Sequence, residues 1–252
     1  MLEVKDIAVS YGSRAVVDGV SFSLRAGEWL MIVGPNGAGK STLISAMTGS
    51  APCNGAAVYE GENLLAMKPA ERAKRVGVLM QSNHPGYSFS VEEVVRLGRY
   101  AWRKGMFAGE SGEDEDKVEQ ALLETGMVAL RRQSVLTLSG GELQRTFLAQ
   151  ILAQDPKILI LDEPANHLDL VYQQQVFELI KRWIQRSGRA AISVVHDLSL
   201  ARTYGSHALL MQEGRVAGYG TIDAVMQPPS LEKVYGMDVY AWMHRMLGQW
   251  CE

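Results

Sequence analysis

The chain has 252 residues, of which 47% are hydrophobic and 21% are charged, and its formal net charge at pH 7 is −3. This length allows one large domain or two small ones, and the composition is ordinary for a soluble globular protein. The small negative charge argues against a non-specific nucleic-acid binder, which carries a basic excess. Because no apolar run approaches the ~18 residues of a membrane helix and no signal-peptide pattern opens the chain, we expect a cytosolic protein.

The N-terminal part predicts a half-buried antiparallel sheet, because apolar and polar residues alternate along 2–9 and again along 20–24. Later strands have a different pattern, since continuous apolar runs are typical of strands buried on both faces of a parallel sheet. Four such runs occur, at 28–33, 75–80, 157–162 and 190–195. Helical patterns at 40–49 and 171–188 fall between them, which indicates an α/β fold with helices on the sheet faces.

Residues 88–154 interrupt the alternation of strands and helices. Three helical patterns follow one another there, at 90–102, 114–127 and 140–154. We interpret this stretch as a helical insertion into the α/β core. The acidic run at 109–116 is expected to be a solvated loop and helix start, because acidic side chains suit the first turn of a helix.

The stretch GPNGAGKST fits the phosphate-binding pattern G-x-x-x-x-G-K-[ST] and has the required context, directly after an apolar strand and before a helix. Its glycines let backbone N–H groups face phosphate oxygens, and Lys40 is expected to reach the β- and γ-phosphates of a nucleoside triphosphate. Ser41 is expected to ligate Mg²⁺. The candidate nucleotide-binding residues are Gly34, Pro35, Asn36, Gly37, Ala38, Gly39, Lys40, Ser41 and Thr42.

Polar residues follow three of the apolar runs, where ligands bind at the carboxyl ends of parallel strands. Asp162 is a candidate Mg²⁺ ligand, and Glu163 is a candidate base for the attacking water, although it could instead cap a helix beginning at Pro164. His196 is either catalytic or a satisfied structural histidine. Gln81 could contact Mg²⁺ or water, but an isolated glutamine in a loop is weaker evidence.

A second glycine-rich stretch, LSGGELQR, lies about a hundred residues after the first. Ser139 and Glu142 form a capping-box pattern, so one interpretation is simply a well-made helix start. Two glycines inside the box cost backbone entropy, however, and Gly140 and Gly141 leave the helix N-terminus uncluttered for an anion. The pattern therefore predicts a second phosphate-binding site.

GPNGAGKST, LSGGELQR, ILILDEP, HLD and SVVHD, in this order and spacing, resemble the Walker A, signature, Walker B, D-loop and H-loop of an ABC ATPase. The resemblance covers about residues 2–220. It implies a P-loop NTPase (RecA-like) fold with an N-terminal antiparallel β-subdomain and an inserted helical subdomain. It also implies head-to-tail dimers, in which ATP and Mg²⁺ lie between the P-loop of one subunit and the signature helix of the other. The resemblance also implies roles for matching positions. Tyr11 would stack on adenine, Gln81 would sense the membrane partner and Glu163 would polarise the water. His196 would steady the γ-phosphate, and Asp169 would communicate across the dimer.

Within that family, FSVEEVVRLGRYAW and DEPANHLDLVYQQQVFELI resemble importers of iron-siderophores, haem or cobalamin, with molybdate importers nearby. This resemblance implies that the chain binds permease subunits in the membrane and lies on the cytoplasmic face of the cell membrane. A substrate-binding protein would be a partner only indirectly, through the permease. A soluble assembly factor of the iron–sulfur-cluster type and a nucleotide-dependent switch are the alternatives. We expect an ATPase domain at 1–220, with its helical insertion at about 88–154, and a C-terminal extension at 221–252 that carries no interpretable motif.

Overall fold

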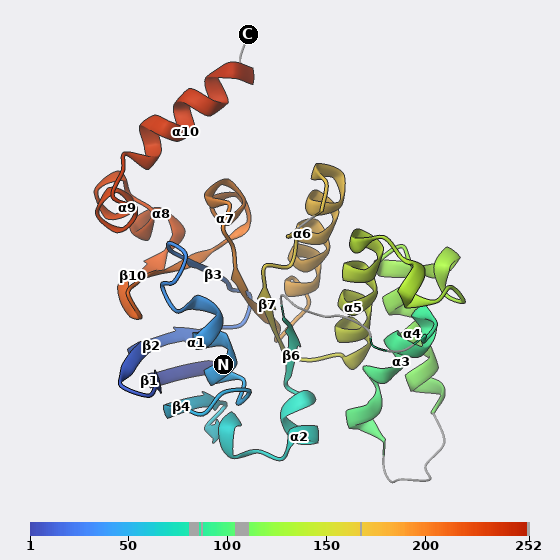
Figure 1. The fold of residues 1–252 in the computed structure, drawn as a ribbon. Helices are drawn as coiled ribbons and strands as arrows, with labels where there is room; N and C mark the ends of the chain where they lie inside the picture. The colour runs from blue at the N-terminus through green and yellow to red at the C-terminus, as the bar shows by residue number, and fades with distance from the viewer. Residues whose placement is uncertain (81–85, 87, 104–110, 167, 251–252) are drawn as a thin grey trace. The chain divides into compact units, whose positions relative to one another are not determined.

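A computed structural model describes residues 1–80, 86, 88–103, 111–166 and 168–250 (Figure 1). The chain divides into two compact units. The first unit comprises residues 1–65 and 194–252, and the second comprises residues 66–193. Among the described residues, no helix is both long and apolar enough to cross a membrane.

The first unit opens with a four-stranded antiparallel sheet, as the alternating pattern predicts. Its strands are β1 (Leu2–Tyr11), β2 (Arg14–Leu24), β4 (Asn54–Tyr59) and β5 (Glu62–Asn63), in the order β2-β1-β4-β5. In β1 the apolar side chains of Leu2, Val4, Ile7 and Val9 are buried, while their polar neighbours are exposed. Burial of one face of the strand therefore fixes its register.

The same unit contains a second group of strands, β3 (Trp29–Val33), β9 (His207–Gln212) and β10 (Arg215–Thr221), in the order β10-β9-β3. Strands β3 and β9 are parallel, and β10 pairs antiparallel with β9. The unit's helices are α1 (Lys40–Met47), α7 (Leu198–Tyr204), α8 (Ile222–Val225), α9 (Pro228–Tyr235) and α10 (Val239–Leu247), followed by the 3-10 turn η5 (Gly248–Trp250). Every residue of β3 is buried, as expected for a central parallel strand.

The second unit carries strands β6 (Val76–Leu79), β7 (Ile158–Asp162) and β8 (Ala190–Val194), in the order β8-β7-β6, and β6 and β7 are parallel. Its helices are α2 (Pro69–Ala73), α3 (Val91–Leu97), α4 (Gly112–Glu124), α5 (Gly140–Gln154) and α6 (Leu170–Ile184). Short 3-10 turns occur at Leu64–Ala66, Tyr100–Trp102, Val128–Leu130 and Val135–Thr137. The expected fold class, parallel strands with an antiparallel subdomain and inserted helices, is confirmed.

Several helix boundaries differ from the sequence-based expectation, most of all the ends of α3 and α6. The expected helix at 90–102 ends at Leu97, and a separate 3-10 turn follows. The break occurs at Gly98, where a Cβ atom would lie 2.1 Å from the backbone oxygen of Gln150 in α5. The expected helix at 171–188 ends at Ile184, and Gly188 adopts a positive φ of 72° beyond it.

The beginning of α4 is fixed to the rest of its unit by a buried ion pair. The guanidinium of Arg99 donates from Nε to Oδ1 of Asp114 at 2.7 Å and from Nη1 to the Ala153 carbonyl at 2.9 Å. Burial opposes the charge on Asp114, but hydrogen bonds from Ser111 and Arg99 outweigh it and lower the pKa of Asp114 to about 2. Removing either partner would leave a buried charge uncompensated.

The close approach of α3 and α5 leads to a stability prediction. Gly98→Ala should lower the free energy of unfolding by about 1–3 kcal/mol, because the added methyl group has no room against the α5 backbone. The matched control is Gly112→Ala at the first residue of α4, where no atom lies within 4 Å of the new Cβ. That change should leave stability unchanged or raise it by up to ~1 kcal/mol. Urea denaturation measures both, and equal effects of the two substitutions would contradict the packing argument.

Candidate nucleotide-binding and hydrolysis site

The loop between β3 and α1 contains two glycines that no other residue could replace, because a side chain there would collide with the backbone of neighbouring strands. Gly34 has φ 147°, and a Cβ there would lie 2.2 Å from the Met211 carbonyl oxygen. Gly39 has φ 93°, and a Cβ there would lie 2.6 Å from the Val16 carbonyl oxygen. Glycine alone tolerates this combination of left-handed backbone and close approach. The loop is therefore held tightly between β3 and the first turn of α1.

Lys40 points back into this loop and is buried, with 6% of its surface exposed. Its Nζ donates to the backbone oxygens of Gly34 at 2.7 Å and Pro35 at 3.0 Å. An ammonium group at the first residue of a helix adds its charge to the partial positive charge of the helix N-terminus. The loop thus concentrates positive potential, which suits an anion such as a phosphate chain.

Three further candidates of the first unit are exposed. Tyr11 ends β1 with 56% of its surface exposed. Ser41 is exposed in the first turn of α1. His196 is exposed after β8, and the next residue, Asp197, caps α7 by accepting from the backbone N–H of Ser199 at 2.7 Å. The cap fixes where α7 begins and so holds the backbone directly after His196.

In the second unit, Asp162 and Glu163 occupy the carboxyl end of β7. Asp162 is only 1% exposed. Glu163 adopts φ 54°, a left-handed conformation that costs a non-glycine residue about 1–2 kcal/mol. Its Oε2 accepts from the side-chain amide of Asn166 at 2.7 Å, and its backbone oxygen accepts from the Asn166 N–H at 3.1 Å. Asp6, Glu60, Asp155 and Glu213 have the same left-handed φ, so it is the position of Glu163 directly after β7 that makes it a candidate.

The alternative that Glu163 caps the next helix is wrong. Helix α6 begins at Leu170, and its cap is Asp169, whose Oδ1 accepts from the Tyr172 N–H at 2.9 Å. Asp169 therefore has a local structural function in addition to any role between subunits. Asn166, by contrast, is a candidate site residue that the sequence reading missed. Asn166 follows Glu163 by three residues, a spacing at which a side chain often hydrogen-bonds across a turn. That spacing could have indicated Asn166 from the sequence.

The glycines of the second glycine-rich stretch open α5, and the expected capping box is confirmed. Ser139 Oγ accepts from the Glu142 N–H at 3.4 Å, while Glu142 Oε2 accepts from the N–H and hydroxyl of Ser139, both at 2.8 Å. These two bonds, the backbone one first, lower the pKa of Glu142. Ser139 and Gly140 are exposed, and no atom lies within 4 Å of a Cβ built on Gly140. Packing against the described residues thus does not require glycine at position 140.

The signature helix α5 is joined to the segment that follows Asp162. Gln144 donates its side-chain amide to the Pro164 carbonyl at 3.1 Å, and the Arg145 guanidinium lies 4.4 Å from the centre of the Tyr172 ring. These contacts connect the second phosphate-binding candidate to the carboxylate segment within one unit. Gln144 is a second residue that the sequence reading missed, and its contact is long-range, so no local pattern could have indicated it.

The expected Mg²⁺ ligands fit that ion chemically. Ser41 and Asp162 offer hydroxyl and carboxylate oxygens, the donors that Mg²⁺ prefers, whereas the third expected ligand, Gln81, lies outside the described residues. Across the described part of the chain, no cluster of three or more His, Cys, Asp or Glu side chains could hold a metal alone. A nucleotide-associated Mg²⁺ needs no such cluster, because phosphates and water supply its other ligands.

Comparison with known proteins agrees with this geometry. Residues 17–166 match the family model described as ABC transporter. The hemin import ATP-binding protein HmuV of Pseudomonas entomophila is 38% identical over 250 residues, covering 97% of this chain and 96% of HmuV. The uncharacterized ABC transporter ATP-binding protein YvrA of Bacillus subtilis is 39% identical over 97% of this chain. This chain spans only 55% of the length of YvrA.

Solved structures show the same fold. An inward-facing conformation of a putative metal-chelate type ABC transporter aligns with a TM-score of 0.81 and 24% identity, covering 94% of this chain and 89% of that one. A dimeric ATP-binding cassette in a post-hydrolysis state bound to ADP and Pi aligns with a TM-score of 0.77 and 22% identity, covering 88% of this chain and 99% of that one. Together with the family match over residues 17–166, these findings establish that the chain belongs to the ABC transporter family and carries its ATP-binding cassette.

Proposed function

We propose that this chain is the ATP-hydrolysing subunit of an ABC importer for a metal chelate, namely an iron-siderophore, haem or cobalamin. The observation that carries the ATPase part is the buried Lys40 ammonium inside a glycine loop at the start of α1. The substrate class is supported by the hemin-import name of HmuV and the metal-chelate title of the aligned transporter structure. The cassette is residues 1–220, and residues 221–252 form a C-terminal extension.

ATP binding uses the first unit. The N–H groups of the 34–39 loop and of the first turn of α1 bind the β- and γ-phosphate oxygens, and Lys40 exchanges its carbonyl partners for these oxygens. The exposed ring of Tyr11 stacks on adenine. Ser41, Asp162 and Gln81 are the residues that would hold Mg²⁺, and the ion would neutralise charge that develops on the phosphates.

Hydrolysis requires a bond from a water oxygen to the γ-phosphorus while the bond to the β,γ-bridging oxygen breaks and ADP leaves. Glu163 orients that water and takes its proton, and the amide of Asn166 restricts the carboxylate to one orientation. The imidazole ring of His196 donates an N–H to the γ-phosphate oxygens.

Two copies of the chain are required for turnover. Each ATP lies between the P-loop of one copy and the Ser139-Gly140-Gly141 turn of the partner copy, with Asp169 at the shared boundary. The exposed N-terminus of α5 supports this arrangement, since none of the described residues comes within 4 Å of a Cβ built on Gly140. The dimeric form of the aligned post-hydrolysis cassette supports it as well. Closure of this dimer by ATP shifts the conformation of the attached permease.

The proposed partners are two integral membrane permease subunits, with a substrate-binding protein engaged only through them and no nucleic acid. The chain then lies on the cytoplasmic face of the cell membrane. Co-purification of a polytopic permease after co-expression tests this assignment, with metal-chelate uptake in the reconstituted transporter as the expected activity. Retention of a cluster scaffold instead would favour the soluble assembly factor, and molybdate-dependent ATPase activity would favour the neighbouring importer class.

Glu163→Gln tests the hydrolytic role. The variant should bind MgATP and accumulate as a dimer, while hydrolysis falls about 10²- to 10⁴-fold because the amide cannot accept the proton of water. Size-exclusion chromatography with MgATP and phosphate release measure the two effects. Glu113→Gln, an exposed carboxylate on α4, is the control and should behave as wild type. Normal turnover in Glu163→Gln would refute the role.

Ser139→Ala separates capping from catalysis, because Ser111 caps α4 in an equivalent capping box. Both Ser139→Ala and Ser111→Ala should cost about 1 kcal/mol of unfolding free energy. Only Ser139→Ala should reduce ATPase activity, by about tenfold or more, because only that turn contacts the partner's nucleotide. Equal ATPase rates in the two variants would mean that the turn at 139–141 is a helix start and nothing else.

A further inference from the structure

In the proposed dimer, the second unit of each copy takes part in both ATP sites. Glu163 acts on the ATP bound by its own copy, whereas the turn at 139–141 contacts the ATP of the partner copy. Both belong to the unit of residues 66–193. A contact that fixes the turn relative to the carboxylate segment, residues 162–166 and 168–169, would therefore couple the two ATP sites, because a shift at one site would reach the other through this unit.

A side-chain stack joins α5, which begins with this turn, to α6, which follows the carboxylate segment (Figure 1). The Arg145 guanidinium lies 4.4 Å from the centre of the Tyr172 ring, within the ~6 Å range of a cation–π contact. Arg145 Nε is buried without a hydrogen-bond partner among the described residues, and Nη1 donates to the Thr125 carbonyl at the long distance of 3.4 Å. With its hydrogen bonding this incomplete, the guanidinium depends on the aromatic face for its orientation.

Two further contacts connect the first turns of α5 to the carboxylate segment. Gln144, the residue before Arg145, donates its side-chain amide to the Pro164 carbonyl at 3.1 Å. A Cβ built on Gly141 would lie 3.3 Å from Cδ2 of Leu168, so the glycine turn and the segment are already close together. The start of α5 thus contacts this part of the chain at positions 141, 144 and 145, and its orientation follows that of the segment.

A cavity of about 450 Å³ lies beside the stack. The end of α4, α5 and α6 line it, with Arg145, Leu148, Gln174 and Leu179 among its walls. Close packing is what normally fixes the orientation of one helix against another. Because a cavity rather than packed side chains separates α5 from α6 here, the Arg145–Tyr172 stack carries a larger share of their relative orientation.

Tyr172 is also connected to the proposed boundary with the partner copy. Its backbone N–H donates to Oδ1 of Asp169 at 2.9 Å, the cap that begins α6. The two residues between them, Leu170 and Val171, expose large apolar side chains, as residues that meet another protein surface do. A contact made by the partner copy at this boundary would therefore reach Tyr172 through the cap and Arg145 through the ring.

We propose that Arg145 and Tyr172 are positioning residues that couple the two ATP sites. Their stack keeps the turn at 139–141 aligned with the carboxylate segment of the same copy, and neither side chain touches the nucleotide. Without the stack, the start of α5 reorients relative to Glu163, and each ATP site closes independently of the other. This inference rests on the proposed sharing of each ATP by two copies.

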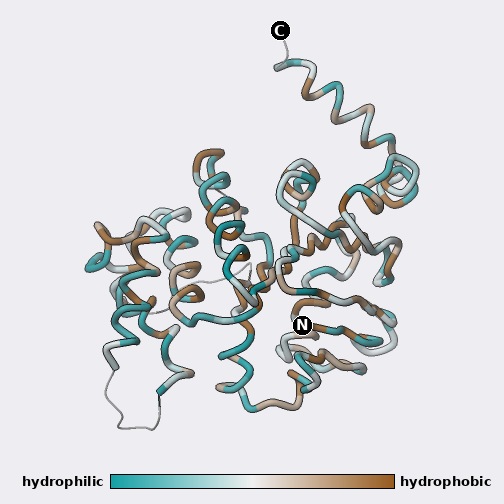
Figure 2. Tube along the Cα trace, turned by 180° about the vertical axis from the view of Figure 1, so that it is seen from behind, coloured by the Kyte–Doolittle hydropathy of each residue, from teal (hydrophilic) through white to brown (hydrophobic). Residues whose placement is uncertain are grey.

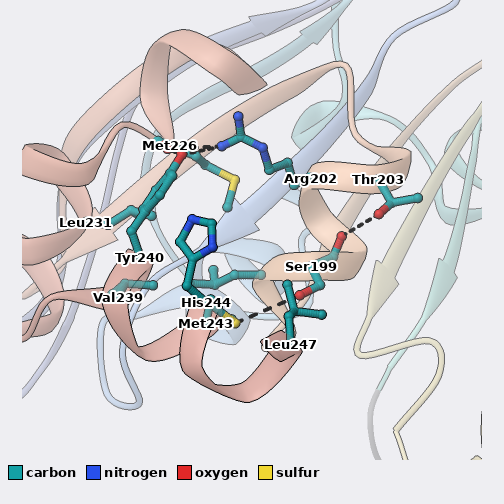
Figure 3. Close-up of a pocket in the computed structure, with 11 residues that line it drawn as sticks. Ser199, Arg202, Thr203, Met226, Leu231, Val239, Tyr240, Met243, His244 and Leu247 are labelled. Carbon is teal, nitrogen blue, oxygen red and sulfur yellow. Dashed lines mark hydrogen bonds between the residues drawn. The ribbon is translucent and has the colours of Figure 1, made fainter. Parts of the chain in front are cut away.

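Tyr172→Leu tests the inference, with Tyr240→Leu as a matched control. The Arg202 guanidinium lies 5.7 Å from the centre of the Tyr240 ring, so this substitution also removes an arginine–tyrosine stack. Tyr240 belongs to α10, the helix that leads to the C-terminus in Figure 2. It lines a mainly apolar pocket of about 300 Å³ between α7 and the C-terminal helices (Figure 3). Neither residue of this control pair belongs to the unit that contains Glu163 and the turn at 139–141.

Tyr172→Leu should lower the Hill coefficient of ATP hydrolysis to about 1, from a wild-type value above about 1 and at most about 2, the number of sites. In the Glu163→Gln background it should weaken the MgATP-dependent dimer about three- to tenfold by analytical ultracentrifugation, the range for one cation–π contact. The affinity of the dilute monomer for a fluorescent ATP analogue should stay unchanged, because the P-loop lies in the other unit. Tyr240→Leu should change none of these quantities.

Two more variants separate positioning from a general loss of structure. Tyr172→Phe keeps the aromatic face and should retain wild-type behaviour, whereas Arg145→Gln should reproduce Tyr172→Leu. The double variant Arg145→Gln/Tyr172→Leu should be no more impaired than either single variant, because both remove the same contact.

Wild-type cooperativity and dimer affinity in Tyr172→Leu and Arg145→Gln would overturn the positioning role, as would equal losses in Tyr172→Phe or Tyr240→Leu. A wild-type Hill coefficient of about 1 would overturn the coupling and leave the ATPase assignment in place. The proposed function itself would fail only if wild type bound no ATP or formed no dimer with it.

Discussion

The buried ammonium of Lys40 is the constraint on which the nucleotide half of the structure depends. A charge that is 94% removed from solvent must be compensated, and the loop does this with the carbonyl oxygens of Gly34 and Pro35. Those carbonyls can converge only because Gly34 and Gly39 adopt conformations with no room for a side chain. A phosphate chain offers the ammonium a better partner than two neutral dipoles, so the loop is built for an anion.

The two compact units divide the candidate site residues. The P-loop, Tyr11 and His196 belong to the unit of residues 1–65 and 194–252, whereas Asp162, Glu163 and the turn at 139–141 belong to residues 66–193. In the second unit, Gln144 and Pro164 connect the signature helix to the carboxylate segment. This gives a physical reason for the long sequence separation of the two glycine-rich stretches. The first stretch forms a tight loop that suits an anion, and the second begins a helix with an exposed N-terminus.

Local patterns predicted much of this structure because the residues concerned act locally. The capping box at Ser139 needs only residues 139–142, and the alternation along β1 needs only one buried face. Contacts between distant segments could not be predicted. The close approach of Gly98 to the backbone of Gln150 depends on how α3 and α5 pack, and the hydrogen bond from Gln144 to the Pro164 carbonyl joins residues twenty positions apart. The left-handed backbone of Glu163 could not be predicted either, because a non-glycine residue disfavours it.

The central claim is that each ATP is shared by two copies, and mixing two variants with impaired ATPase activity tests it most directly. In a mixed pair of Lys40→Ala and Ser139→Ala, one site combines both defects, while the other joins an intact P-loop to an intact signature turn. Random pairing puts one intact site in about half of the pairs, so ATPase activity should reappear on mixing and be highest near equal amounts. A mixture no more active than its separate components would contradict the account, as would full wild-type activity at dilutions where no dimer persists.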